Sequence, residues 1–324
     1  MNLLLTGGLG YIGSHTCVAL AAAGYELVVL DSLANSKLSV LDRLRELIRK
    51  DLGFVRADVR DAAALDATLA SRPFSAVLHF AGLKSVGESV AKPELYREVN
   101  VGGARTLLEA VRRHGVRRFV FSSSATVYGV PEFLPYTEAH PLRPMNPYGE
   151  SKLAVERLLE AESAAHPGFA HARLRYFNPI GAHPSGRIGE DPRGTPENLL
   201  PYVAQVAVGK RAALRVWGKD YDTPDGTGVR DYIHVMDLAE GHVAALRYLE
   251  KVGRSITVNL GTGRGHSVLE VVAAFERASS VTIPLEFHPR RPGDIAVCYA
   301  DPAFAGRELG WKAHLGIEQM SQDA

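Results

Sequence analysis

The sequence predicts an α/β protein with a doubly wound parallel sheet and a second, smaller α/β lobe. In residues 1–178, short apolar runs alternate with helical patterns, the order found in a parallel sheet with right-handed crossovers. The apolar runs are nearly continuous, as in strands covered on both faces. The expected strands are 3–6, 26–30, 54–57, 76–80, 119–122 and 172–175, and the expected helices are 15–23, 65–71, 100–114 and 148–165.

Residues 179–324 follow a different rhythm. We expect them to form mainly the smaller lobe, with some segments returning to pack on the first domain. Glycine and proline crowd residues 178–195, which predicts a long loop near a ligand. A helix at 199–208, a turn-rich stretch at 218–228, and strand and helix patterns at 231–249 and 257–277 follow. The ligand is expected between the two lobes.

The composition excludes several classes of function. Because 37 basic residues balance 36 acidic ones, the chain lacks the basic excess of a non-specific nucleic-acid binder. No stretch approaches the roughly 20 apolar residues of a membrane helix, and the short run at 3–5 suits a strand better than a signal peptide. Two cysteines, Cys17 and Cys298, indicate a reducing cytoplasm rather than a disulfide framework. The histidines lack metal-ligand spacing, so no metal site is expected.

A glycine-rich turn follows the first expected strand and opens a helix. Gly7, Gly10 and Gly13 allow a tight turn and a close approach to a pyrophosphate, whose charge then lies at the helix N-terminus. Asp31 ends the second expected strand, where a carboxylate accepts hydrogen bonds from adenine-ribose hydroxyls and repels a 2′-phosphate. These residues predict a Rossmann site that prefers NAD to NADP.

The next two expected strands end in further candidates. Asp58 and Val59 lie where the adenine is usually met, although Asp58 also fits a solvated strand end. Phe80, Ala81 and Gly82 end the fourth expected strand beside the place of the nicotinamide ribose. Lys84 follows, as a contact to the cofactor or as an ordinary exposed loop lysine.

A tyrosine and a lysine stand four residues apart in one expected helix. Tyr148 and Lys152 therefore share a helix face, and Ser122 to Ser124 end a strand at the same edge of the sheet. A cation about 4 Å from the phenol contributes roughly 4 kcal/mol at an effective dielectric of 20, enough to bring the tyrosine pKa from near 10 to about 7. We therefore expect Tyr148 to act as a general base, with Ser124 relaying or orienting the proton; the alternative is a core aromatic.

Longer strings make the resemblance specific. Segments 7–15, 79–84, 122–129, 175–179, 183–186 and 228–234 resemble the UDP-glucose 4-epimerase family of the extended short-chain dehydrogenase/reductases over essentially the whole chain. That resemblance implies that Tyr148 takes the proton of the sugar 4-hydroxyl while C4 gives a hydride to bound NAD, which returns it to the opposite face. Sugar-nucleotide 4,6-dehydratases carry an Asp-Glu pair where this chain has Ala125 and Thr126, so dehydration is disfavoured. The resemblance to the epimerase family also implies a homodimer formed by helices 100–114 and 148–165.

The resemblance assigns contacts residue by residue. The implied cofactor contacts are Gly7, Gly10, Tyr11, Ile12, Gly13, Asp31, Asn35, Ser36, Asp58, Val59, Phe80, Ala81, Gly82, Lys84, Ser122, Tyr148, Lys152, Tyr176 and Phe177. The implied UDP-sugar contacts are Ser124, Tyr148, Asn178, Asn198, Leu199, Val216, Trp217, Arg230, Arg291, Asp294 and Cys298. Arg230 and Arg291 suit a diphosphate clamp, the alternative for each being a surface ion pair. Asp294 would hold ribose hydroxyls or orient Arg291.

Two positions depart from the family pattern. Val99 replaces an asparagine found in some epimerases, so no cofactor contact is assigned there. Cys298 stands where members restricted to UDP-glucose and UDP-galactose carry a bulky tyrosine, which predicts activity on UDP-N-acetylglucosamine as well; the alternative is a small buried strand residue. Competing functions are another sugar-nucleotide enzyme of this fold, such as a decarboxylase or 2-hydroxyl epimerase, and a non-catalytic dinucleotide sensor.

Overall fold

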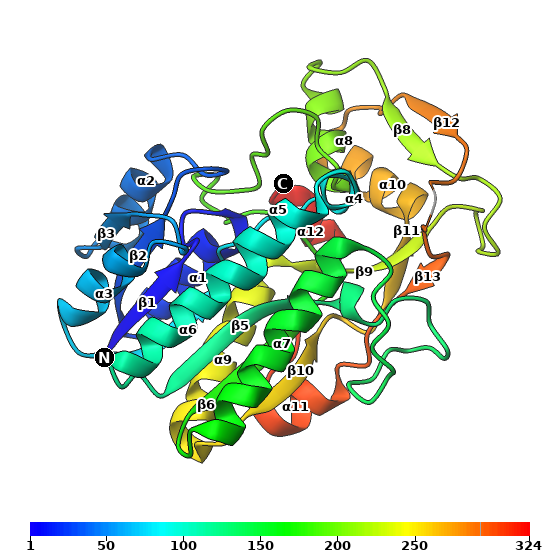
Figure 1. The fold of residues 1–324 in the computed structure, drawn as a ribbon. Coiled ribbons are helices and arrows are strands. Elements are labelled where there is room, and N and C mark those ends of the chain that lie inside the picture. The colour runs from blue at the N-terminus through cyan, green and yellow to red at the C-terminus, as the bar shows by residue number, and fades with distance from the viewer. Residues whose placement is uncertain (292) are drawn as a thin grey trace.

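A seven-stranded parallel sheet forms the centre of the computed structural model, which describes residues 1–291 and 293–324 (Figure 1). The strand order is β10-β6-β5-β4-β1-β2-β3, so the order reverses between β1 and β4. The strands are β1 (Asn2–Thr6), β2 (Glu26–Asp31), β3 (Gly53–Arg56), β4 (Phe74–His79), β5 (Arg118–Ser124), β6 (Ala170–Tyr176) and β10 (Ile256–Leu260). The prediction of a doubly wound α/β fold is confirmed, and ligands of such sheets bind at the carboxyl ends of the strands beside this reversal.

Helices cover both faces of the sheet, because successive side chains of each strand point to opposite sides. Leu3 and Leu5 enter one apolar cluster and Leu4 enters another on the opposite face. The first cluster is closed by α1 (Tyr11–Ala22), α2 (Ser39–Ile48), α9 (Val235–Val252) and α11 (Ala303–Leu309). The second is closed by α3 (Ala62–Ala70), α6 (Gly103–Arg113) and α7 (Pro147–Ala165). Burial on both faces explains the continuous apolar runs in the sequence.

The smaller lobe is built from the second half of the chain. A four-stranded sheet contains β7 (Asn178–Ile180), β9 (Val229–His234), β11 (Gly265–Ser267) and β13 (Val297–Cys298), and a two-stranded sheet contains β8 (Leu214–Trp217) and β12 (Leu285–His288). The helices α8 (Leu199–Ala207), α10 (Val268–Ser279) and α12 (Ile317–Gln322) pack with them around a separate apolar cluster. In Figure 1 this lobe stands above the carboxyl ends of the large sheet.

Several elements differ from the sequence-based expectation. Strand β7 lies inside the segment 178–195, which was expected to be a loop, because it pairs with β9. The expected helix 100–114 is a π-helical segment, η1 (Arg97–Gly102), followed by α6. Short helices α4 (Val86–Ala91), α5 (Pro93–Tyr96) and 3₁₀ segment η2 (Ala125–Val127) complete the fold. Strand β10 and helix α9 come from the second half of the chain but join the large sheet and its cover. Within the described residues, no helix is long and apolar enough to cross a membrane.

Candidate functional site

The turn between β1 and α1 forms a cradle of bare backbone. Gly7 has a φ of 72°, and a Cβ on it would lie 2.5 Å from the backbone nitrogen of Ala81. A Cβ on Gly13 would lie 2.5 Å from the carbonyl oxygen of Gly7. Gly10 caps α1 and has no side chain to occupy the first-turn N–H groups. The turn therefore brings backbone N–H groups and a helix N-terminus to the reversal point of the sheet, which suits a pyrophosphate.

Asp31 is buried at the end of β2, next to this cradle. Its carboxylate accepts hydrogen bonds from the backbone N–H of Leu9 at 3.0 Å, the backbone N–H of Leu33 at 2.9 Å and the Ser36 hydroxyl at 2.7 Å. A carboxylate has about four lone-pair positions, so it can accept one more hydrogen bond from a ribose hydroxyl. Ser36, which is expected to touch the cofactor, is the residue that donates to Asp31, and neighbouring Asn35 is exposed. The cradle and this carboxylate fit NAD.

The candidates on the next strand ends are partly engaged with protein groups. Arg60 donates to both oxygens of Asp58, at 3.0 and 2.8 Å, and these hydrogen bonds lower the pKa of Asp58. Val59 is buried against helix α6. Phe80 and Ala81 are half-buried and follow β4 directly, so their backbone lies at the reversal point. Gly82 is exposed next to them.

A carboxylate that the sequence analysis missed joins the cofactor side to the substrate side. Glu190 accepts from Lys84 Nζ at 2.6 Å and from Asn198 Nδ2 at 2.7 Å. Its other oxygen, Oε2, is buried and has no hydrogen-bond partner among the described residues. Tyr11 reaches the same region, where its hydroxyl donates to the carbonyl of Gly181 at 2.6 Å. A glutamate in a glycine- and proline-rich segment carries no periodic signal, so sequence patterns could not single it out.

Local signals at the start of α7 place the catalytic candidates. The Asn146 side chain caps the helix by accepting from the backbone N–H of Gly149 at 2.9 Å, and Pro147 occupies the first turn. A Cβ on Gly149 would lie 2.8 Å from the carbonyl oxygen of Thr126, so this glycine lets α7 approach the end of β5 closely. Tyr148 is half-buried at this contact, and Lys152 is buried one turn later.

The catalytic candidates converge on the end of β5. Lys152 Nζ donates to the carbonyl oxygen of Ser122 at 2.8 Å and lies 5.7 Å from the centroid of the Tyr148 ring. The Ser124 hydroxyl accepts from the backbone N–H of Thr126 at 3.2 Å and from its hydroxyl at 2.9 Å. The structure therefore brings Ser122, Ser124, Tyr148 and Lys152 together, as the sequence predicted.

The expected pKa of Tyr148 near 7 is wrong for the ligand-free chain. Burial raises the pKa of Tyr148 to about 12, and the nearby Ser124 hydroxyl lowers it only in part. Burial also lowers the pKa of Lys152 to about 8. The physical reason is that the lysine ammonium points to the Ser122 carbonyl and lies over the Phe121 ring, 5.1 Å from its centroid, rather than at the phenolic oxygen. The lysine charge therefore does not bring the pKa of Tyr148 to near 7 in this arrangement.

Other residues frame this edge. Tyr176, opposite Ser124 in the sheet register, is buried and hydrogen-bonds His242, and Phe177 is buried beside it. Asn100, which the sequence analysis missed, donates to the carbonyl of Leu83 at 3.0 Å and to the Ser151 hydroxyl at 2.9 Å. Its π-helical setting is not readable from a sequence, although π-helical turns are frequent at functional sites.

The charged candidates of the smaller lobe and Cys298 are half-buried or exposed. Arg291 donates to both carboxylate oxygens of Asp294, at 3.0 and 3.3 Å, the ion pair that the sequence analysis gave as the alternative to a diphosphate contact. Among the described residues, Arg230 donates to the adjacent Val229 carbonyl, at 2.9 Å. Cys298 pairs with Arg230 in the register of β13 and β9 and is half-buried, with its thiol pKa raised to about 11 by burial.

The remaining contacts of this lobe differ in exposure. Asn178 begins β7, Asn198 is the exposed cap of α8, and Leu199 begins that helix. Val216 is buried in the apolar cluster of the lobe, whereas its neighbour Trp217 is 37% exposed. No group of three or more metal-ligating side chains occurs in the described part of the chain.

The chain is similar to known proteins over its whole length. A family model described as GDP-mannose 4,6 dehydratase matches residues 4–324. The UDP-glucose 4-epimerase of Bacillus subtilis (strain 168) is 58% identical over 324 residues, covering 100% of this chain and 96% of that protein.

Two solved structures are similar to this chain over its whole length. UDP-glucose-4-epimerase from Stenotrophomonas maltophila, solved with bound NAD and formylated UDP-arabinopyranose, has a TM-score of 0.98 at 52% identity, covering 100% of this chain and 96% of that one. The enzyme from Bifidobacterium longum in complex with NAD⁺ and UDP has a TM-score of 0.97 at 50% identity with the same coverage. The chain therefore belongs to the GDP-mannose 4,6-dehydratase family and, within it, to the UDP-glucose 4-epimerases.

Proposed function

We propose that this chain interconverts UDP-glucose and UDP-galactose by inverting C4 through a transient 4-keto sugar, with tightly held NAD. The observation that carries the proposal is the convergence of Ser124, Tyr148 and Lys152 on one sheet edge beside the glycine cradle. Such an arrangement joins a proton acceptor to a dinucleotide site. Relatives with this activity at more than half identity support the assignment.

The residues of the chain divide the work of the reaction. Tyr148 takes the proton of the sugar 4-hydroxyl and later returns it. NAD held by the glycine turn and Asp31 would supply a hydride acceptor that becomes the donor. Burial raises the pKa of Tyr148 to about 12, and the hydrogen bond with the Ser124 hydroxyl lowers it, so Ser124 favours the phenolate. Ser124 orients the hydroxyl, and Lys152 remains fixed by the Ser122 carbonyl.

Residues around the site favour one of the two nicotinamide cofactors and disfavour dehydration of the sugar. Asp31 repels a 2′-phosphate and so favours NAD over NADP. Ala125 and Thr126 provide no acid–base pair for dehydration, and the Thr126 hydroxyl is already bonded to Ser124 at 2.9 Å.

Substrate recognition is proposed to lie on the smaller lobe. Arg230 and Arg291 suit the two phosphates of the UDP group, since a guanidinium donates two parallel hydrogen bonds to a phosphate. When Arg291 binds the phosphates, the Asp294 carboxylate accepts hydrogen bonds from the ribose hydroxyls in place of the Arg291 guanidinium. Half-buried Cys298 provides room beside the sugar, so we propose that UDP-N-acetylglucosamine and UDP-N-acetylgalactosamine are also substrates.

The organisation of the protein follows from the same proposal. Residues 1–178 form the NAD-binding domain and residues 179–324 mainly the UDP-sugar lobe. Helices α6 and α7 form the interface of a homodimer; they share a surface groove that Leu108 and Leu158 line. The thiols of Cys17 and Cys298 are both free, which suits a reducing cytoplasm.

The test is an NMR assay of the purified protein with UDP-galactose and no added NAD, with UDP-N-acetylgalactosamine in a parallel tube. New anomeric signals of UDP-glucose establish both the reaction and a retained cofactor. Conversion in the second tube supports the wider specificity. Change at C2 instead would identify a different sugar-nucleotide enzyme, and no change even with added NAD would refute the assignment.

A further inference from the structure

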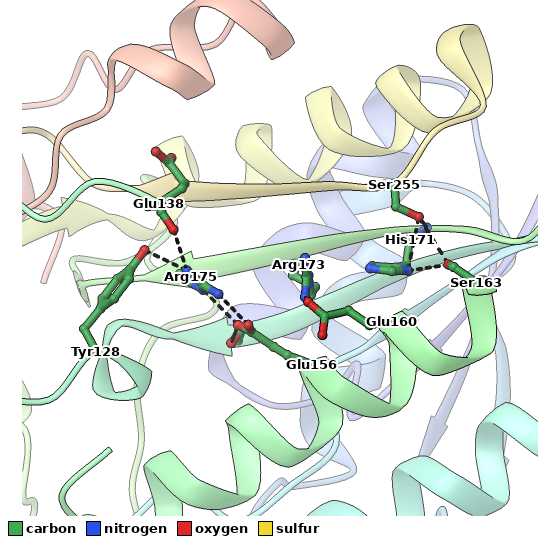
Figure 2. A network of polar contacts seen from close by, with 10 residues as sticks. Tyr128, Glu138, Glu156, Glu160, Ser163, His171, Arg173, Arg175 and Ser255 are labelled. Atoms are coloured by element: carbon green, nitrogen blue, oxygen red, sulfur yellow. Dashed lines mark hydrogen bonds and ion pairs between the residues drawn. The ribbon is translucent and has the colours of Figure 1, made fainter. Parts of the chain in front are cut away.

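Three polar pairs connect helix α7 to strand β6 in a regular ladder (Figure 2). Glu156 pairs with Arg175, Glu160 with Arg173, and the Ser163 hydroxyl with His171. Steps of about one turn along the helix match steps of two residues along the strand, because alternate strand residues face the same side. The rungs look equivalent in the sequence, but they differ in burial and in what else they touch.

The rung nearest the catalytic candidates is fully enclosed. The Glu156 and Arg175 side chains are 1% and 4% exposed, and the guanidinium donates to both carboxylate oxygens, at 3.0 and 2.6 Å. A buried ion pair has a large desolvation cost, so its remaining hydrogen-bonding capacity must also be used. Here the Tyr128 hydroxyl accepts from Arg175 at 3.1 Å, and the Ser123 hydroxyl donates to Glu156 at 2.6 Å.

The second rung serves as an internal contrast. Glu160 is 55% exposed, whereas Arg173 is 15% exposed. A pair whose carboxylate is exposed to solvent contributes little to stability. It joins the same helix to the same strand as the first rung, so the two rungs differ mainly in the burial of the carboxylate and in its other partners.

One of the other partners of Glu156 lies at the end of β5. Lys152 hydrogen-bonds the Ser122 carbonyl, and one turn later Glu156 accepts from the hydroxyl of adjacent Ser123. Two successive turns of α7 are thereby bonded to two successive residues of β5, and Ser124 and Tyr148 follow directly at the catalytic end of the same contact. Arg175 holds Glu156 in place from β6, next to Tyr176.

We propose that Glu156, held by Arg175 and Ser123, is a positioning residue that fixes the depth and rotation of α7, so that Tyr148 and Lys152 face Ser124. The proposal rests on the epimerase function proposed above. Glu156 touches neither substrate nor cofactor in this role; it acts through the placement of the proton acceptor. A misplacement of about 1 Å can cost about a hundredfold in rate.

The experiment compares Glu156→Gln with Glu160→Gln in the cofactor-loaded protein. Glutamine keeps the shape but removes the charge in both variants, which lie one turn apart on the same helix. We expect Glu156→Gln to lower kcat for UDP-galactose by about tenfold or more, with KM changed by less than about twofold. Glu160→Gln should keep both constants near the wild-type values. Retained NAD and thermal melting report whether each variant is folded.

Glu156→Gln leaves the Arg175 charge unpaired, and this could unfold the protein. A second variant tests the positioning role in that case. Glu156→Met combined with Arg175→Met removes both charges, and apolar replacement of a buried pair is often neutral for stability. A folded double variant with lowered kcat supports the positioning role. Wild-type kcat in either folded variant, or an equal loss in Glu160→Gln, overturns it. Failure of the wild-type protein to epimerise UDP-galactose would instead refute the underlying function.

Discussion

The two sides of the active site are held in different ways. The catalytic edge (Ser122, Ser124, Tyr148, Lys152) rests on buried partners, with Lys152 bonded to a strand carbonyl at 2.8 Å. The proposed substrate rim (Arg230, Arg291, Asp294, Cys298) consists of half-buried or exposed residues of the smaller lobe. At the rim, Arg291 hydrogen-bonds the Asp294 carboxylate at 3.0 Å, and Arg230 hydrogen-bonds the backbone carbonyl of the adjacent Val229.

This difference separates two tasks of an enzyme. Groups that act on the reacting atoms must be in place before the transition state forms, because reorganisation during the reaction costs rate. Groups that only capture the nucleotide can hold temporary partners and exchange them for phosphate or ribose. Variants at the edge should therefore change kcat, whereas variants at the rim should change KM or the choice of sugar.

The largest effect is expected at the edge. Tyr148→Phe removes the hydroxyl that accepts and returns the proton and leaves the ring in place. We expect kcat for UDP-galactose to fall by about 10² to 10⁴-fold, with little change in KM, in a steady-state assay coupled to UDP-glucose formation. Full activity in this variant would remove Tyr148 from the mechanism.

How far the sequence predicts this arrangement depends on the range of the interaction. The glycine turn and the pairing of Tyr148 with Lys152 depend on short spacings, so the sequence indicated both. The direction of the Lys152 ammonium depends on the Ser122 carbonyl, a backbone group with no sequence signal, and the expected pKa of Tyr148 was wrong for that reason.

The range of the interactions also decides which parts of the fold the sequence predicted. Six strands of the large sheet were recognised from local apolar runs, and each of their ends in the structure lies within two residues of the expected one. The entry of β10 into that sheet depends on its pairing with β6, far away in the sequence. Glu190 and Glu156 likewise acquire their roles from partners on other elements, such as Lys84 and Arg175.

The next effect is expected at the rim. Arg230→Met keeps the length of the side chain but removes the charge that would meet a phosphate. A hydrogen bond to a charged group contributes about 1.5–3 kcal/mol, so KM for UDP-galactose should rise by about ten- to a hundredfold, with kcat much less affected. Arg215→Met, at an exposed position of the neighbouring strand β8, is the matched control. A fall in kcat at unchanged KM would contradict the division between rim and edge.

A change of sugar preference is expected from Cys298→Tyr. A bulky ring on β13 should fill the space proposed for an N-acetyl group and lower kcat/KM for UDP-N-acetylgalactosamine by at least about tenfold relative to UDP-galactose. Parallel assays of the two sugars give this ratio directly. Cys17→Ala, on α1 and buried in the apolar core, should leave the ratio unchanged. An unchanged ratio in Cys298→Tyr would mean that this position does not select the sugar.

The smallest effect concerns the framework under the catalytic edge and appears in stability rather than rate. His79 ends β4, where it hydrogen-bonds the Thr6 hydroxyl at 2.7 Å, and burial lowers its pKa to about 3. Between about pH 6.5 and 3, His79 is protonated in the unfolded chain but neutral in the folded chain. The free energy of unfolding therefore falls as pH falls. The contribution of His79 approaches about 1.4 kcal/mol per pH unit. His79→Asn should reduce the slope by that amount in urea unfolding curves measured between pH 5.5 and 4.5, and equal slopes in the two proteins would show that this buried edge is not a source of acid sensitivity.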